Sequence, residues 1–161
     1  MRKPKASGQK KRKPIDTASS LAQLYQLRQP FSVGPDGQPS TFGSGLIDRC
    51  ERLLVKPLRQ FEPGDLRVML YQQFYPETLV PLALPLLEQE PLLDGDGYPG
   101  DLLSSVLHQN ASFWRNSPDL LSRIKTVVDQ ALSENGLSES ERVSIEAFKA
   151  KMERPFADVL K

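Results

Sequence analysis

The 161-residue sequence has a single cysteine, Cys50, and a single histidine, His108. One cysteine excludes a disulfide within the chain and is typical of a reducing compartment, so we expect a cytoplasmic protein. A zinc site needs three or four cysteine or histidine ligands, which this chain does not have. No apolar run reaches the roughly 18 residues that a membrane-spanning helix requires, because Pro81 and Pro85 interrupt the longest one. No hydrophobic segment follows the basic N-terminus, which argues against a secretory signal.

Motifs of catalytic and nucleotide-binding sites are also missing. The sequence has no Walker phosphate loop, no GxGxxG dinucleotide motif and no GxSxG nucleophile turn. Cys50 and His108 could formally make a nucleophile–base pair, but Cys50 falls on the apolar stripe of an expected helix, where an unreactive thiol is usual. Carboxylates are plentiful, yet no hydrophobic pocket is apparent that would raise the pKa of one of them. We therefore expect a non-enzymatic protein without cofactor or metal, with an acid-dependent enzyme as a weaker alternative.

Positive and negative charges are separated along the chain. Residues 1–14 contain seven lysines and arginines and no acid, whereas residues 62–101 contain eight acids and one base. The basic segment fits either a solubilising tail or an arm that contacts nucleic acid weakly and without sequence preference. A helical adaptor or nucleic-acid-associated protein using this arm is therefore an alternative function. The acidic segment is either a solvated surface or a site for a basic partner, because opposite charges speed the encounter of two proteins.

Hydrophobic periodicity and helix-capping residues predict an all-α fold, a compact multi-helix domain without strands. Residues 1–20 lack periodicity and are expected to be a disordered basic tail. Residues 21–45 are expected to form a short helix and a glycine- and proline-rich linker. Residues 46–134 are expected to form the helical domain, and residues 135–161 a C-terminal helix that packs on it.

Two helices of this fold are predicted from their apolar side. The first has apolar residues at three- and four-residue spacing, which should form one buried stripe: Leu46, Ile47, Cys50, Leu53 and Leu54. The last opens with a capping box at residues 138–141 and has an expected apolar side of Val143, Ile145, Phe148 and Met152. Phe113 and Trp114 are also expected in the core, although Trp114 and Arg115 are of the residue types that anchor interfaces.

Proline marks the other helix starts. The tetrapeptide PGDL occurs at residues 63–66 and again at 99–102. Because proline suits the first helical position and an acid suits the first turn, each copy predicts a helix start. Ser117 followed by Pro118 predicts another, with Ser117 as the N-cap. Residues 76–87 are too apolar for a surface helix and predict a buried helix that its prolines kink or start late.

The loop LDGDGYPGDLL at residues 93–103 combines three aspartates with three glycines. It does not fit a calcium-binding EF-hand, because the fifth, sixth and twelfth positions counted from Asp94 are Tyr98, Pro99 and Ser105. We interpret it as an acidic corner between two helices with Tyr98 at its tip. On charge and placement alone, the candidate partner-binding residues are Glu88, Glu90, Asp94, Asp96 and Tyr98.

A set of short motifs points to a known family. In order, they are KPL at 56–58, DLR at 65–67, VPLAL at 80–84, GDGYPGDLL at 95–103 and FW at 113–114. With these motifs, the chain from Leu46 to Ile124 resembles the immunity proteins of bacterial contact-dependent growth inhibition (CDI) systems. The resemblance implies a small cytoplasmic protein that binds and blocks the toxic C-terminal domain of a cognate effector. Many such toxins are nucleases, which need basic surfaces to hold phosphates, so an acidic surface would suit such a partner.

Overall fold

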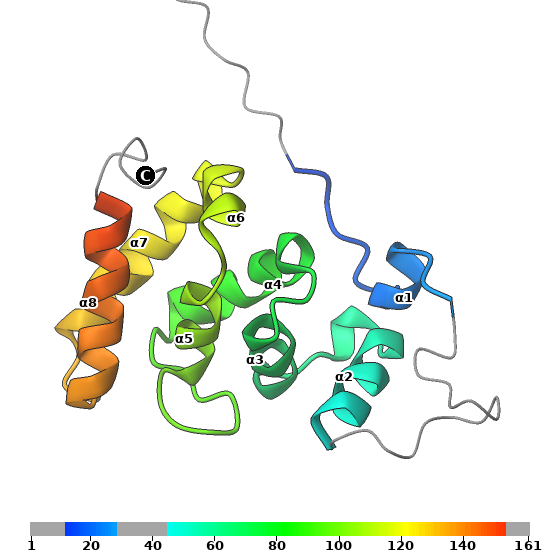
Figure 1. Ribbon diagram of the computed structural model, residues 1–161, viewed down its shortest axis with the longest axis horizontal. Coiled ribbons are helices and arrows are strands. Elements are labelled where there is room, and N and C mark those ends of the chain that lie inside the picture. The colour runs from blue at the N-terminus through cyan, green and yellow to red at the C-terminus, as the bar shows by residue number, and fades with distance from the viewer. Residues whose placement is uncertain (1–11, 29–44, 154–161) are drawn as a thin grey trace, which may run out of the picture.

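The computed structural model of the chain describes residues 12–28 and 45–153 (Figure 1). These residues form helices and no β-strand, so the predicted all-α fold is confirmed. None of the described helices is long and apolar enough to span a membrane. The helices are α1 (Leu21–Leu24), α2 (Gly45–Val55), η1 (Leu58–Gln60), α3 (Pro63–Tyr71), α4 (Pro76–Gln89), α5 (Asp101–Leu107), α6 (Ala111–Arg115), α7 (Pro118–Ser133) and α8 (Glu139–Glu153).

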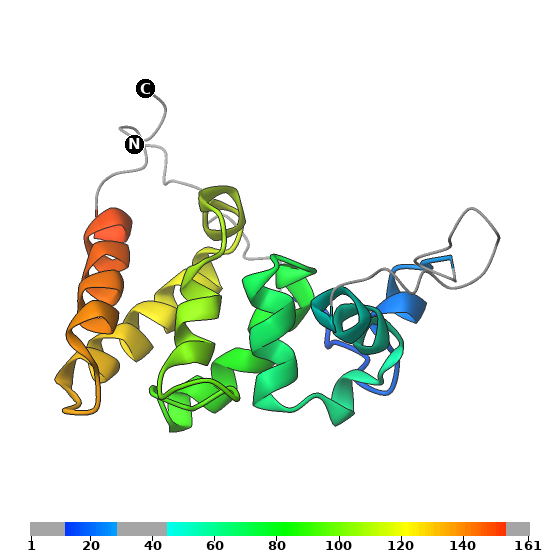
Figure 2. The same cartoon turned by 60° about the horizontal axis from the view of Figure 1, so that its bottom comes forward.

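The helices form an elongated row. From the end that holds α1 and α2, α3 packs on α2, α5 packs on α3, and α8 packs on α5. Figures 1 and 2 show these helices side by side, with α8 at the far end. α4 and α7 pack on each other across this row, and α4 also contacts α3 and α5. The loop from α4 to α5 therefore lies against the middle of the row.

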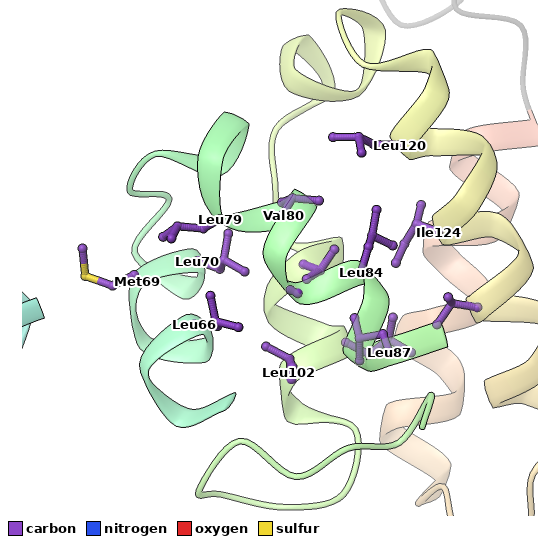
Figure 3. Packing of buried hydrophobic residues seen from close by; sticks show 14 of the residues in the cluster. Leu66, Met69, Leu70, Leu79, Val80, Leu84, Leu87, Leu102, Leu120 and Ile124 are labelled. Atoms are coloured by element: carbon purple, nitrogen blue, oxygen red, sulfur yellow. The ribbon is translucent and has the colours of Figure 1, made fainter. Parts of the chain in front are cut away.

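The core is centred on the apolar helix α4. Figure 3 shows its side chains between α3, α5 and α7, with Leu84 in the middle of the cluster. Burial of one such side chain stabilises the fold by roughly 1.5–3 kcal/mol, so these contacts hold the row together. The residues labelled there that have no more than 2% of their surface exposed are Leu66, Met69, Leu70, Leu79, Val80, Leu84, Leu87, Leu102, Leu120 and Ile124.

Two prolines lie inside α4 without ending it. The expected late start does not occur, because Pro76 takes the first helical position and the helix continues to Gln89. Pro81 is half-buried and Pro85 is exposed. Residues four apart share one face of a helix, so both prolines lie on the outer side of α4. The carbonyl groups that lose a hydrogen bond to proline therefore lie near the surface, where water can satisfy them.

The packed chain begins earlier than the sequence indicated. Of the expected tail, residues 1–11 lie outside the described part, but residues 12–20, the strap, run along the helices. The Arg12 guanidinium pairs with Asp119 at 3.0 Å. The carbonyl oxygens of Thr17 and Ser19 accept hydrogen bonds from the backbone of η1 at 2.8 and 3.1 Å. An extended strap held by backbone groups has no hydrophobic period, which explains why periodicity did not reveal it.

Several helix starts differ from the prediction. Pro99 precedes α5, which begins at Asp101 after Gly100 in a left-handed conformation. Ser117 is the N-cap residue of α7, but its side chain makes no capping bond and instead accepts one from Arg12 at 2.7 Å. Asn110 caps the short helix α6, which the sequence did not predict, by accepting from the backbone of Phe113 at 2.8 Å.

The predicted apolar stripes are only partly buried. On α2, Cys50 and Leu53 are buried, but Leu46 and Ile47 are 44% and 48% exposed, because they precede the turn of the helix that meets the core. On α8, Ile145, Phe148 and Met152 are buried, whereas Val143 is 55% exposed, so its assignment to the apolar side is wrong. The core positions expected for Phe113 and Trp114 are confirmed, with exposures of 5% and 0%.

Candidate functional site

The acidic corner, residues 93–103, is folded around the carboxylate of Asp101. One oxygen of this side chain accepts a hydrogen bond from the backbone of Gly95 at 2.5 Å, and the other accepts from Tyr98 at 3.4 Å. Asp94 adds a third bond of this kind, accepting from the backbone of Gly97 at 2.9 Å. Asp101 is only 3% exposed. This aspartate is therefore a structural centre of the loop and is not available to a partner.

The glycines of the corner make room for that carboxylate. A Cβ atom at Gly95 or at Gly97 would lie 2.9 or 2.6 Å from an oxygen of Asp101, closer than side chains tolerate. Gly100 has a φ of 87°, which glycine adopts without the steric cost that a side chain brings. Gly95 and Gly97 are thus explained by close packing around one buried acid, and Gly100 by its backbone conformation.

Bases from α2 and α3 hold the corner in place. The guanidinium of Arg67 lies 3.2 Å from Asp101 and donates to the carbonyl of Gly95 at 2.5 Å. Arg49 lies 3.4 Å from Asp96 and 3.8 Å from Asp65. The corner is thereby linked by one ion pair to each of these two helices, and the pair of Arg49 with Asp65 joins α2 to α3.

These ion pairs reduce the negative charge that the acidic segment presents. Four of its eight acids pair with a base: Asp65, Glu88, Asp96 and Asp101. The shortest pair joins Lys56 to Asp65 at 2.6 Å. Among the described residues, the remaining four acids make no ion pair: Glu62, Glu77, Glu90 and Asp94. The surplus charge is therefore carried by a smaller set of residues than the composition suggested.

The structure brings three of the five candidate residues together on one loop. Asp94, Asp96 and Tyr98 lie on the corner, and Tyr98 is 46% exposed. Glu90 is exposed and follows the last residue of α4, as its C-cap. Glu88 instead accepts two hydrogen bonds from Arg123 of α7, at 2.7 and 2.8 Å, which hold the pKa of Glu88 below its usual value.

A groove next to Tyr98 was not predicted. It lies between α5 and α8, has a volume of about 280 Å³, and is lined by Tyr98, Ser104 and His108 on one side and Glu141, Ser144 and Phe148 on the other. Figure 1 shows α5 and α8 side by side. The two helices are far apart in the sequence, so no local sequence pattern predicts that they meet. The capping box identified Glu141 as a residue that orders its own helix. Nothing in the sequence placed it opposite Tyr98.

The two residues considered as a catalytic pair have separate structural roles. Cys50 is buried on α2, and this burial raises the pKa of its thiol, the opposite of what a nucleophilic cysteine needs. The His108 ring stacks on Tyr71 with centroids 5.0 Å apart. Within residues 12–28 and 45–153, no group of three or more histidine, cysteine or carboxylate side chains could hold a metal ion.

Comparison with known proteins gives one match. A family model of the CDI immunity proteins matches residues 35–124, more than half of the chain. The chain belongs to the CDI immunity protein family. The resemblance noted between Leu46 and Ile124 is thereby confirmed. Neither the curated proteins nor the solved structures yielded a match to this immunity protein.

The matched segment of the immunity protein contains the whole acidic corner and the helices on either side of it. It ends within the second turn of α7, so α8 lies outside it. The groove is therefore built from one wall inside the matched segment, on α5, and one wall outside it, on α8.

Proposed function

We propose that this immunity protein neutralises the toxic C-terminal domain of its cognate CDI effector by binding it in the cytoplasm, one molecule to one, through the acidic corner. The observation that carries this proposal is a preformed loop, fixed by the buried Asp101, that exposes Tyr98 in a member of this family. A loop that is ordered before binding loses little conformational entropy when the complex forms. Tyrosine is also among the residue types that dominate interface energetics.

The proposed partner surface is basic. Glu90 and Asp94 offer carboxylates without an ion pair among the described residues. Glu90 lies just before the corner, and Asp94 lies on it with Tyr98. Asp96 and Glu88 belong to the proposed surface only if they exchange an internal ion pair, with Arg49 or Arg123, for one with the toxin. A nuclease would suit this surface, because it must hold phosphates with basic residues. Attraction between the two surfaces would raise the association rate and would weaken with salt.

Kinetic binding measurements test the proposal. The purified chain is combined with the purified C-terminal toxin domain of the effector encoded beside it, at low and high salt. The double variant Glu90→Gln with Asp94→Asn removes two charges, and the new asparagine can still accept from Gly97. We expect it to slow association at low salt by about 3–10-fold and to weaken the salt dependence. Tyr98→Ala should weaken affinity by about 30-fold, as a hot-spot residue does.

A matched control is available on α4. Glu77 is exposed and makes no ion pair among the described residues, so Glu77→Gln removes one charge away from the corner. This variant should associate at the wild-type rate. Equal rates for the corner variants and the control would remove the corner from the mechanism. A wild-type chain that neither binds the toxin domain nor protects cells that express it would overturn the proposed function itself.

A further inference from the structure

We propose that the groove between α5 and α8 receives a segment of the toxin that combines apolar side chains with one lysine or arginine, placed beside Glu141. This proposal rests on the proposed function and extends the binding surface from the corner to α8. Tyr98 joins the two areas, because it lies on the corner and also lines the groove.

The size of the groove favours a protein segment over a small molecule. Pockets for small molecules usually measure about 300–1,000 Å³ and enclose most of the ligand. This groove, at about 280 Å³, is at the small end of that range and is partly open to solvent. One or two side chains of a partner would fill it. The floor is apolar, since Phe148 is 8% exposed and Ile145 is 4% exposed. Ser104 and Ser144 line its walls.

The charge of the groove favours a basic residue in that segment. Glu141 lines it, and no lysine or arginine is among the lining residues, all of which lie in the described part of the chain. The Glu141 carboxylate accepts from the backbone of Ser138 at 2.7 Å through one oxygen. A carboxylate has two oxygens and room for several donors, so Glu141 can bind a cation without releasing its own helix.

The walls of the groove are held before any partner arrives. The ring of His108 is stacked on Tyr71, with an angle of 13° between the ring planes. Phe148 packs edge-on against the fully buried Trp114, with centroids 5.8 Å apart. Side chains fixed in this way lose little freedom on binding, which favours affinity. Tyr98, which also lines the groove, is of a residue type that is frequent among sites of large binding energy.

Filling the groove tests the proposal. Ser144 is an exposed residue of α8 whose hydroxyl donates within its own helix, to the carbonyl of Ser140 at 2.9 Å. Ser144→Trp should fill the groove and weaken binding of the purified toxin domain by at least 100-fold. The control is Ser122→Trp, which places the same side chain at an exposed position of α7 away from the groove and should bind as wild type does.

Removing one charge tests the basic residue of the partner. Glu141→Gln keeps a side-chain oxygen for the capping bond, because glutamine also serves in a capping box. We expect this variant to weaken toxin binding by about tenfold and to leave the melting temperature within a few degrees of wild type. Its control is Glu139→Gln, an exposed glutamate in the same turn of α8 that does not line the groove.

The outcomes separate this proposal from the proposed function. Loss of binding in Ser144→Trp, together with the smaller loss in Glu141→Gln and intact controls, supports the groove. Wild-type affinity in both groove variants overturns the groove as a docking site, while the proposed function stands. Should Ser144→Trp fail to fold, Glu141→Gln alone decides, and an unchanged affinity overturns the proposal. A wild-type chain that does not bind the toxin domain removes both.

Discussion

The two copies of PGDL use their aspartate in the same way and yet start their helices at different residues. In both, the carboxylate accepts from the backbone of the residue three positions earlier, Glu62 at 3.1 Å for Asp65 and Tyr98 at 3.4 Å for Asp101. In both, it also pairs with a base, Lys56 at 2.6 Å and Arg67 at 3.2 Å.

The difference lies in the proline and the glycine. Pro63 is the first residue of α3, and Gly64 is inside that helix. In the second copy Pro99 stands before the helix and Gly100 is left-handed, because its N–H bonds back to the carbonyl of Leu92 at 2.9 Å. The tetrapeptide therefore determines that its aspartate accepts a hydrogen bond from the backbone three residues earlier. The contacts of the residues around the tetrapeptide determine at which residue the helix begins.

The two PGDL segments also meet in the structure, through Arg67 and Gly64. Arg67, which follows the first PGDL, pairs with the aspartate of the second. A side chain at Gly64 would overlap the carboxylate of Asp96, so the acidic corner rests directly on the start of α3. This arrangement makes the second aspartate the more deeply buried of the two, with 3% of its surface exposed against 8% for Asp65.

The largest expected effect comes from removing the charge of the buried aspartate. Asp101→Asn leaves Arg67 without its partner and loses one of two backbone bonds, so the free energy of unfolding should fall by about 2–4 kcal/mol. The matched variant Asp65→Asn should cost about 1–2 kcal/mol, because Lys56 can turn to water. Denaturant unfolding of both variants measures the difference. Equal losses of unfolding free energy in the two variants would show that the deeper burial of Asp101 does not make its charge more important for stability.

Replacing the glycine of each PGDL segment compares the two segments again, with a smaller expected change in the free energy of unfolding. Gly100→Ala forces a side chain into the left-handed region and should lower the free energy of unfolding by about 1–2 kcal/mol. Gly64→Ala gains helix propensity of about 0.5–1 kcal/mol but displaces the exposed Asp96 carboxylate, so its net change should be small. Thermal unfolding compares the two. A larger loss for Gly64→Ala would mean that the contact with Asp96 outweighs the backbone conformation of Gly100.

The smallest effect concerns pH and the ion pair of Glu88 with Arg123. The pKa of Glu88 is lowered in the folded protein by the hydrogen bond from Arg123, so the pair stabilises the fold above the usual glutamate pKa of about 4.3. This contribution is lost as the pH falls through the lowered pKa. Because the pair is exposed, Glu88→Gln should cost at most about 1 kcal/mol at pH 7, and the difference from wild type should vanish in acid.

Unfolding measured from pH 7 to pH 3 checks this prediction. Glu90→Gln is the control, since Glu90 is an exposed glutamate near the same end of α4 that makes no ion pair among the described residues. A Glu88→Gln variant that is as stable as wild type at pH 7, or whose deficit persists in acid, would contradict the assignment.

The sequence by itself determined the features that depend on neighbouring residues. The capping box of Ser138 and Glu141 is present, α7 begins at Pro118, and the apolar segment after Pro76 is the central helix. The loop LDGDGYPGDLL predicted the acidic corner, and a set of short motifs indicated the family. Each of these depends on contacts within a few residues or on burial of a whole segment, which periodicity and capping chemistry encode directly.

Only the tertiary structure decided which charges are available and which surfaces meet. Asp101 and Asp96 resemble each other in sequence, but one is buried against Arg67 and the other is exposed beside Arg49. The strap at Arg12 lies on Asp119, and Glu141 faces the groove beside Tyr98, across tens of residues of chain. Such pairings arise from how helices pack on each other, and a local pattern carries no information about the partner that a side chain meets in space.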